Sequence, residues 1–284
     1  MRPLLFGLIL LTACSSPPDS GTNPLVDEAE SRLGATPGGQ IVLRALEAHG
    51  GLEAWHAAPT SSYTWEYSNH GSQTRFKTHM VVDNHSRLAY HDLLEYGTPD
   101  SVETVEARFA WNGTEAWMHP PEQENPNPMF WATTGYYFSS IPFVLADPGL
   151  QYEVLPVDTL DGRPHDMVRV SFDEGVGYSD GDWYTLYVDQ ETDLVTAIRY
   201  TVTYGRGRPA PDATPRENLF YYQDLVTVDG LTVPTRFRGY RYADGLRGDL
   251  RNEAWVTDIS FRRPFDSSRL AVPEGAQVVL PPVG

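Results

Sequence analysis

Residues that could support catalysis or metal binding are scattered along this chain. It contains neither a His-Glu-x-x-His nor a Gly-x-Ser-x-Gly motif, and no glycine loop of the kind that cradles phosphate. Its eight histidines show no recognisable ligand spacing, and His79, His85 and His91 are expected on neighbouring strands and turns. The sequence therefore predicts no metal centre, no cofactor and no catalytic residue.

Acidic side chains form two groups that could in principle be functional. Residues 173–182 place several acids among glycines, and such oxygen ligands could bind Ca²⁺, but the pattern differs from an EF-hand loop. Asp92, Glu95, Glu103 and Glu106 could supply paired carboxylates for acid–base chemistry, yet nothing in their spacing brings two together. We expect both groups to be solvated surface.

Arginines gather near the C-terminal strands of an otherwise acidic chain, at positions 236, 238, 241 and 247. Arg236 and Arg238 are two residues apart, so they would share one face of a strand. Two interpretations remain open. These arginines pair with the excess of acids, or they contact an anionic head group or a protein partner.

Residues 129–145 form the most aromatic stretch of the chain, split by Pro142. It is expected to form one or two short helices or an irregular cover. Its large side chains either pack in the core or line the mouth of an apolar cavity, the usual character of small-molecule sites. The residues predicted to bind a ligand at that mouth are Phe130, Trp131, Tyr136, Tyr137, Phe138 and Phe143.

The N-terminus carries the most specific signal. Arg2 precedes an apolar run over residues 4–11, far shorter than the roughly 20 residues of a membrane-spanning helix. This pattern is typical of a secretory signal peptide. The segment Leu-Thr-Ala-Cys that ends at Cys14, the only cysteine, resembles the lipobox of bacterial lipoproteins. The resemblance implies cleavage before Cys14 and anchoring to a membrane by lipid on its thiol.

Composition and sorting signals narrow the expected location and partners. Ser15 follows the cysteine. In well-studied lipoprotein sorting systems, lipoproteins with a residue other than aspartate at this position are found at the outer membrane. We therefore expect a lipid-anchored protein of the cell envelope, at the outer membrane and facing the periplasm. The formal charge of −17 repels phosphate backbones, so no nucleic-acid partner is expected.

The sequence predicts three regions. Residues 1–13 form the signal peptide, residues 14–38 the lipidated cysteine and a flexible tether, and residues 39–284 one folded domain. A helix is expected over residues 40–49, because apolar residues recur there at helical spacing and Gly50-Gly51 follows.

Beyond Pro59 the pattern changes to strands separated by turn residues. Asn112-Gly113 predicts a two-residue hairpin, and Asp161-Gly162, Asp229-Gly230 and Asp244-Gly245 mark further turns. Many consecutive strands with little helix between them indicate a mainly β (α+β) fold, namely a curved antiparallel sheet or incomplete barrel with a few helices covering its open face. The expected strands span residues 63–67, 74–82, 87–94, 105–111, 152–157, 167–172, 183–189, 195–204, 218–228, 231–242 and 253–261.

Four segments, at residues 45–51, 137–149, 182–189 and 228–235, together resemble an uncharacterised family of bacterial lipoproteins with a LolA/LolB-like fold. The resemblance covers residues 39–273. It implies a strongly curved, incomplete antiparallel barrel whose helices enclose an apolar cavity, the place where the carriers LolA and LolB hold acyl chains.

The leading hypothesis is a non-enzymatic, membrane-anchored protein that binds a lipid or another apolar ligand in this cavity. Its main alternative is a structural or interaction subunit of an envelope assembly, whose concavity is filled by its own side chains and whose partner is another envelope protein. A hydrolytic enzyme without a recognisable motif is the third, and it would need polar residues converging in the cavity. An open cavity favours the first hypothesis, and a filled one the second.

Overall fold

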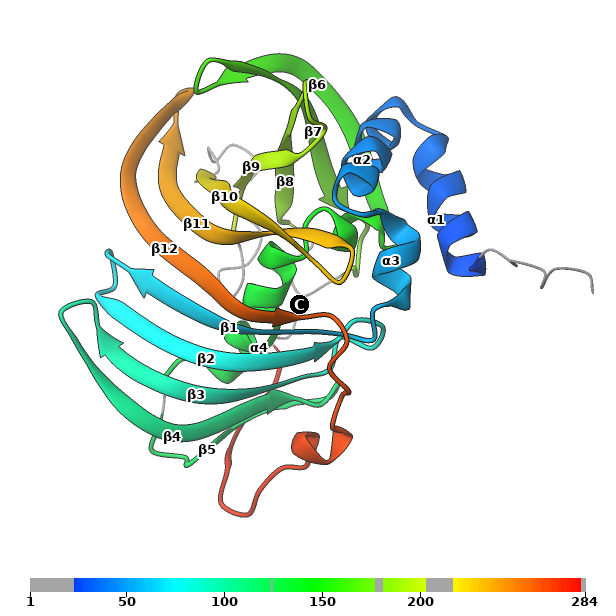
Figure 1. The fold of residues 1–284 in the computed structure, drawn as a ribbon. Helices are drawn as coiled ribbons and strands as arrows, with labels where there is room; N and C mark the ends of the chain where they lie inside the picture. Colours follow the sequence, from blue (N-terminus) through cyan, green and yellow to red (C-terminus); the bar gives the residue numbers. More distant parts are fainter. Residues whose placement is uncertain (1–22, 124, 177–180, 203–216, 282–284) are drawn as a thin grey trace, which may run out of the picture.

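The computed structural model describes residues 23–123, 125–176, 181–202 and 217–281. Within these ranges, thirteen strands form a single sheet whose strand pairs are antiparallel. Figure 1 shows the sheet bending strongly around helix α4 (Pro128–Ser139) without closing on itself. The predicted fold, a curved and incomplete antiparallel barrel with helices, is confirmed.

The sheet consists of two runs of consecutive hairpins joined by the pairing of β1 with β12, and the C-terminal strand β13 is added beside β5. The spatial order is β13-β5-β4-β3-β2-β1-β12-β11-β10-β9-β8-β7-β6. Strand β1 therefore pairs with β12, with Trp65 opposite Val256, and this seam connects the two halves. The strands are β1 (Thr60–Asn69), β2 (Thr74–Asp83), β3 (Ala89–Thr98), β4 (Ser101–Trp111), β5 (Ala116–His119), β6 (Leu150–Leu160), β7 (Arg163–Phe172), β8 (Trp183–Asp189), β9 (Val195–Tyr200), β10 (Glu217–Val228), β11 (Leu231–Ala243), β12 (Leu246–Ser260) and β13 (Gln277–Val279).

Three of the hairpin turns form at the predicted Asp-Gly pairs. In each of the three, both residues have positive φ, as at Asp229 (53°) and Gly230 (93°), which is the conformation that joins twisted strands most closely. The turn at Asn112 differs from the prediction. Only Gly113 has positive φ, the Asn112 amide bonds to the Glu115 carbonyl, and the side chain of Asn112 accepts from the amides of Thr114 and Glu115. This side-chain capping makes a four-residue loop instead of a two-residue hairpin.

The folded domain begins earlier than the predicted boundary at Gly39. Helix α1 (Pro24–Gly34) starts at Asn23, whose side chain accepts from the Leu25 amide, and it buries Val26, Ala29 and Leu33. Residues 24–38 are therefore packed against the domain, because this short apolar stripe fits against the next helix. The sequence itself shows a weak helical pattern over residues 26–33 within the predicted tether, and the structure confirms a helix there.

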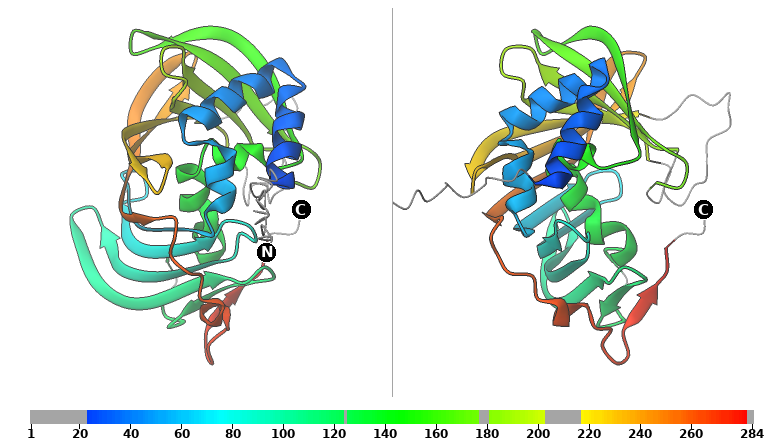
Figure 2. Two further views of the ribbon diagram at one scale, coloured as in Figure 1. Left: turned by 45° about the vertical axis from the view of Figure 1, so that its right-hand side comes forward. Right: turned by 90° about the vertical axis from the view of Figure 1, so that its right-hand side faces the viewer.

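Helices α2 (Pro37–Ala48) and α3 (Gly51–Ala57) complete a group beside the sheet, which Figure 2 shows from two further sides. Gly50 between them has φ of 118°, and a side chain there would collide with the Gly230 carbonyl oxygen. His49 reinforces this approach: its Nδ1 lies 2.7 Å from the Thr232 carbonyl oxygen, and its Nε2 accepts from the Val195 amide at 3.1 Å. The end of α2 is thereby fixed to strands β9 and β11.

The main core lies between the concave face of the sheet, these helices, and the segment formed by α4 and the short 3-10 helix η1 (Phe143–Ala146). Residues 129–145 thus form two short helical pieces, as predicted. Phe143 stacks on Trp55 with ring centroids 4.8 Å apart. This stack joins the helical group to the centre of the barrel.

Candidate ligand cavity

Helix α4 is held inside the curved sheet by hydrogen bonds at three points. The Tyr63 hydroxyl lies 2.5 Å from the Ser139 hydroxyl, His91 bonds to the Ala132 carbonyl, and the Tyr222 hydroxyl donates to the Phe138 carbonyl at 2.9 Å. At Gly135 the helix approaches the sheet so closely that a Cβ would lie 3.2 Å from the Trp65 ring. These contacts fix which side of the helix faces the core.

Two faces of α4 have different roles. Met129, Ala132, Tyr136 and Ser139 are buried against the sheet. Phe130, Thr134 and Phe138 border open space on both flanks of the helix, and the buried residues Met129 and Tyr136 also reach the edge of one of these spaces.

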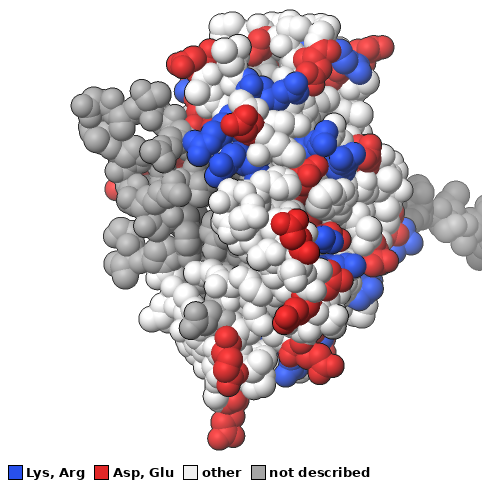
Figure 3. Space-filling view, turned by 90° about the vertical axis from the view of Figure 1, so that its left-hand side faces the viewer, with Lys and Arg blue, Asp and Glu red and all other residues white. Residues whose placement is uncertain are grey.

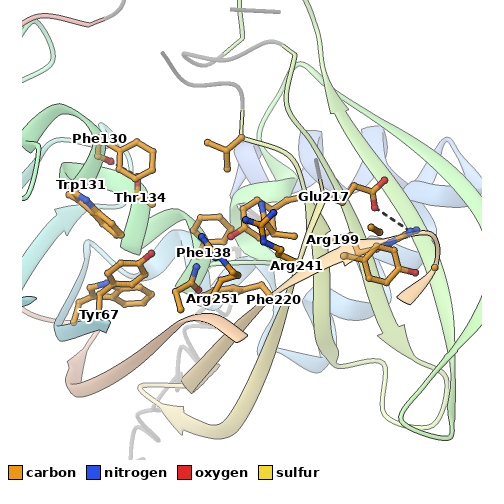
Figure 4. A pocket seen from close by; sticks show the side chains of 18 of the residues that line it. Tyr67, Phe130, Trp131, Thr134, Phe138, Arg199, Glu217, Phe220, Arg241 and Arg251 are labelled. Atoms are coloured by element: carbon orange, nitrogen blue, oxygen red, sulfur yellow. Dashed lines mark hydrogen bonds and ion pairs between the residues drawn. The ribbon is translucent and has the colours of Figure 1, made fainter. Parts of the chain in front are cut away.

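The larger space is a cavity of about 920 Å³ between α4 and the concave side of strands β1 and β9–β12. Figure 4 shows Tyr67 and Trp131 at one end of it, with Phe138 and Phe220 towards its middle. Its aromatic wall comprises Trp65, Tyr67, Phe130, Trp131, Phe138, Tyr200 and Phe220, while Tyr242 borders the cavity from the outer face of β11.

The opposite end of this main cavity is polar. Arg199 and Glu217 form an ion pair of 3.4 Å, and Arg241, Arg251 and Asn252 lie nearby on β11 and β12. Burial raises the pKa of Tyr67 to about 12, against a hydrogen bond from Asn69 and the positive charge of Arg251. The cavity thus joins an apolar wall to a group of cationic side chains.

A second cavity, of about 330 Å³, lies on the other flank of α4 and shares Phe130, Thr134 and Phe138 with the first. Trp111, Met129, Tyr137, Phe172 and Tyr184 give it a mostly aromatic lining. Burial raises the pKa of Tyr137 and of Tyr184, so both phenols remain neutral at physiological pH. The shared residues Phe130, Thr134 and Phe138 lie between the two cavities.

One ion pair borders the second cavity. Arg87 Nη2 contacts both carboxylate oxygens of Asp147 at 2.9 Å. Because both side chains are partly exposed, the pair contributes little to stability, while its position connects the β2–β3 turn to the segment after η1.

The predicted aromatic residues are divided between cavity and core. Phe130, Trp131, Tyr137 and Phe138 line one or both cavities. Tyr136 borders the second cavity but is only 1% exposed, and Phe143, also 1% exposed, lies in the core instead of at a cavity mouth because it stacks on Trp55. A ligand-binding role for the lining residues stays a prediction.

The predicted arginine pair faces away from the cavity. Arg236 and Arg238 both contact Glu253, at 3.7 and 3.0 Å, on the side of the sheet opposite Phe237. The side of the molecule in Figure 3 likewise shows acidic and basic side chains intermixed over its upper half. At Arg236 and Arg238 the structure therefore shows pairing with an acid of the same chain, which is the first of the two interpretations. The sequence analysis did not single out Arg251, and it grouped Arg241 with the other arginines. Arg241 is four residues from Phe237, so alternation along the strand puts both side chains on the same face of β11.

Other predicted sites have less structural context. Cys14 lies outside the described residues, as does part of the acidic segment 173–182. In the described ranges, no three His, Cys, Asp or Glu side chains gather as a metal site would require. His79 and His91 occupy neighbouring register positions on adjacent strands, where His79 pairs with Asp92 and Met80 with His91, so their side chains point to opposite faces. None of the helices in the described part of the chain is both long and apolar enough to cross a bilayer.

Comparison with known proteins identifies the fold. No family model matches the chain, and no curated protein matches it in sequence. Among solved structures, a LolA superfamily protein from Nitrosomonas europaea is similar with a TM-score of 0.50 and 10% identity, covering 82% of this chain and 96% of that one. A DUF1329 family protein from Desulfovibrio piger has a TM-score of 0.52 and 11% identity, covering 83% and 97% respectively. The chain has a LolA-like fold.

Proposed function

We propose that this protein is a membrane-anchored lipoprotein of the bacterial envelope that binds a lipid or another apolar ligand, without catalysing a reaction, in the cavity beside α4. The observation that carries the proposal is the open space of about 920 Å³ between the helix and the concave side of the sheet. Ligand sites commonly enclose about 300–1,000 Å³ and are lined largely by aromatic and apolar groups.

An acyl chain would gain enough free energy in such a site to bind. Burying about ten methylene groups contributes roughly 8 kcal/mol at about 0.8 kcal/mol each. Association costs at least about 4 kcal/mol. At the smallest association cost the difference is about 4 kcal/mol, which corresponds to a Kd of roughly 1 mM, and each further buried methylene group tightens binding by about fourfold. The aromatic wall formed by Trp131, Phe138 and Phe220 would provide the contact surface.

The proposed anchor is lipid on Cys14, with the folded domain held near the outer membrane on its periplasmic side. The short apolar run over residues 4–11 and the Leu-Thr-Ala-Cys segment support this part of the proposal. The LolA-like fold supports the proposal of a lipid ligand, because the carriers that the sequence resembles hold acyl chains between their sheet and helices.

The alternative is a structural subunit that uses the same fold to contact another envelope protein. It would be favoured by a concavity filled with side chains, as Tyr136 and Phe143 fill the region beneath α4. The open space on the other face of α4 favours ligand binding instead.

An acyl-chain probe tests the proposal. Dodecanoate or a fluorescent analogue is titrated into the Cys14→Ser chain while tryptophan emission is recorded, with chain lengths from eight to sixteen carbons. We expect affinity to rise with chain length and to fall in Trp131→Ala. The matched control is Trp183→Ala, since Trp183 lies on β8 away from both cavities, beneath Arg169. Absence of binding, or equal losses in both variants, would argue for the structural subunit.

A further inference from the structure

Two cations at the polar end of the main cavity have no acidic partner among the residues that the structure describes. Arg241 and Arg251 form neither an ion pair nor a side-chain hydrogen bond with any described residue, whereas Arg199 beside them is neutralised by Glu217. Three arginines and two acids, Glu217 and Asp244, line this cavity, which leaves one excess positive charge in a protein of net charge −17. Arg241 is exposed and Arg251 is half-buried, so water can solvate both guanidinium groups, and their donors remain available to an oxyanion that enters the cavity.

The register places these two arginines close together on adjacent strands. Arg241 on β11 is opposite Asn218 on β10, and Gly239, two residues earlier, is opposite Asn252 on β12. Arg251 directly precedes Asn252, at an irregularity in the β11–β12 pairing. Figure 4 shows both guanidinium groups between the Tyr67–Trp131 end of the cavity and the Arg199–Glu217 pair.

Two glycines leave space for the side chains of Arg251 and Asn252. The guanidinium of Arg251 lies against Gly71 in the β1–β2 turn, where any side chain would displace it. Gly239 likewise leaves room for Asn252, whose Oδ1 is buried without a hydrogen-bond partner in the described structure. Asn252 Oδ1 is an acceptor and would not bond to an oxyanion, so the donors that an anionic group could use here are the two guanidinium groups, which have no acidic partner among the described residues.

We infer that the ligand of the main cavity is an anionic amphiphile, whose phosphate or carboxylate head group lies between Arg241 and Arg251 while its apolar part lies against Trp131 and Phe138. Guanidinium groups donate in a planar fork that matches such oxyanions. This inference rests on the proposed function, since it names the class of ligand for the same cavity.

The test compares two amphiphiles that differ only in the head group. Lauroyl lysophosphatidic acid and monolaurin are titrated into the Cys14→Ser chain, and binding is followed by calorimetry and tryptophan emission. Hydrogen bonds to charged groups predict that the phosphate compound binds about tenfold more tightly, with the difference shrinking at high salt. Arg241→Gln and Arg251→Gln should each remove most of that preference and leave monolaurin affinity unchanged.

Arg108→Gln is the matched control, because it removes the same charge from an exposed position on β4. Thermal unfolding of the cavity variants should match the parent, since neither arginine has an ion-pair partner among the described residues. Equal binding of both amphiphiles would overturn the head-group inference and leave the proposed function intact. Binding of neither would overturn the proposed function itself. Equally tight binding of inorganic phosphate alone would show that the arginines form a site for a free anion, and it would overturn the inference of an amphiphilic ligand.

Discussion

His91 on β3 and Ala132 on α4 join the sheet to the helix it encloses, with Nε2 of the imidazole 2.9 Å from the carbonyl oxygen. Since a carbonyl oxygen can only accept, Nε2 must carry the proton. The ring is 1% exposed and stacks on Phe109 with centroids 4.1 Å apart. Burial lowers the pKa of His91 to about 4, and it lowers the pKa of His49 to about 4 as well.

The first prediction concerns acid stability. The unfolded chain takes up protons on His49 and His91 below a pH of about 6.5, whereas the folded chain resists protonation until the pH approaches 4. The free energy of unfolding should therefore be fully present above pH 6.5 and decrease as the pH falls, by at most about 3 kcal/mol per histidine. Urea unfolding at pH 7, 6, 5 and 4 measures this slope. His91→Phe should flatten it, while His85→Gln, at an exposed ring, should not; identical slopes in all three proteins would contradict the assignment.

The second prediction isolates the close approach at Gly50. Gly50→Ala forces a side chain into a positive-φ position and against the Gly230 carbonyl, whereas Gly162→Ala introduces only the conformational strain because nothing lies near it. We expect Gly162→Ala to cost about 1–2 kcal/mol and Gly50→Ala clearly more. Chemical denaturation measures the free energy of unfolding of both variants. Equal losses of stability would mean that the contact between α2 and β11 can shift to accommodate a side chain at no energetic cost.

The third prediction tests the anchor. Acylation requires the thiol of Cys14, so Cys14→Ser should lose the mass of the acyl groups and leave the membrane fraction or remain unprocessed. Ser15→Ala keeps the thiol and should behave like the parent protein. Mass spectrometry with cell fractionation decides the matter, and an unchanged mass and location in Cys14→Ser would disprove lipidation.

The fourth prediction separates the two groups of arginines. Arg236→Gln and Arg238→Gln remove partners of Glu253 on the side of the sheet away from the cavity, so they should leave the affinity for an anionic amphiphile unchanged. Both side chains are 36% exposed, and each loss should cost less than about 1 kcal/mol of stability. A tenfold loss of affinity in either variant would instead place the head group on this outer side.

Local sequence patterns predicted the sheet because most neighbouring strands are also consecutive in the chain. The Asp-Gly pairs set the hairpins, and alternation within strands set their faces. The same alternation distinguishes Arg241, which shares parity with buried Phe237, from Arg236 and Arg238. Applied to the arginines one by one, it would have separated the cavity residue from the outer pair.

The site was harder to predict, since residues 129–145 are aromatic on every side. No polar stripe distinguishes the buried face of α4 from the face that borders the cavity, so Tyr136 and Phe138 look equivalent in the sequence. Tertiary contacts distinguish the two residues. Gly135 allows the helix to pack closely against Trp65, and hydrogen bonds from His91 and Tyr63 fix the rotation of the helix about its axis. Phe143 is likewise placed in the core by Trp55, which is distant in the chain.

The seam between β1 and β12 has a consequence for how the protein folds and is stabilised. Each half of the sheet can form from neighbouring hairpins, but the seam must bring Ser62 to Ser260 and close nearly the whole domain into one loop. The main cavity spans this junction, since Tyr67 comes from one half and Phe220 from the other. The cavity therefore exists only once the halves have met. Ligand binding is thermodynamically linked to the closed seam, so a bound ligand should raise the free energy needed to separate β1 from β12.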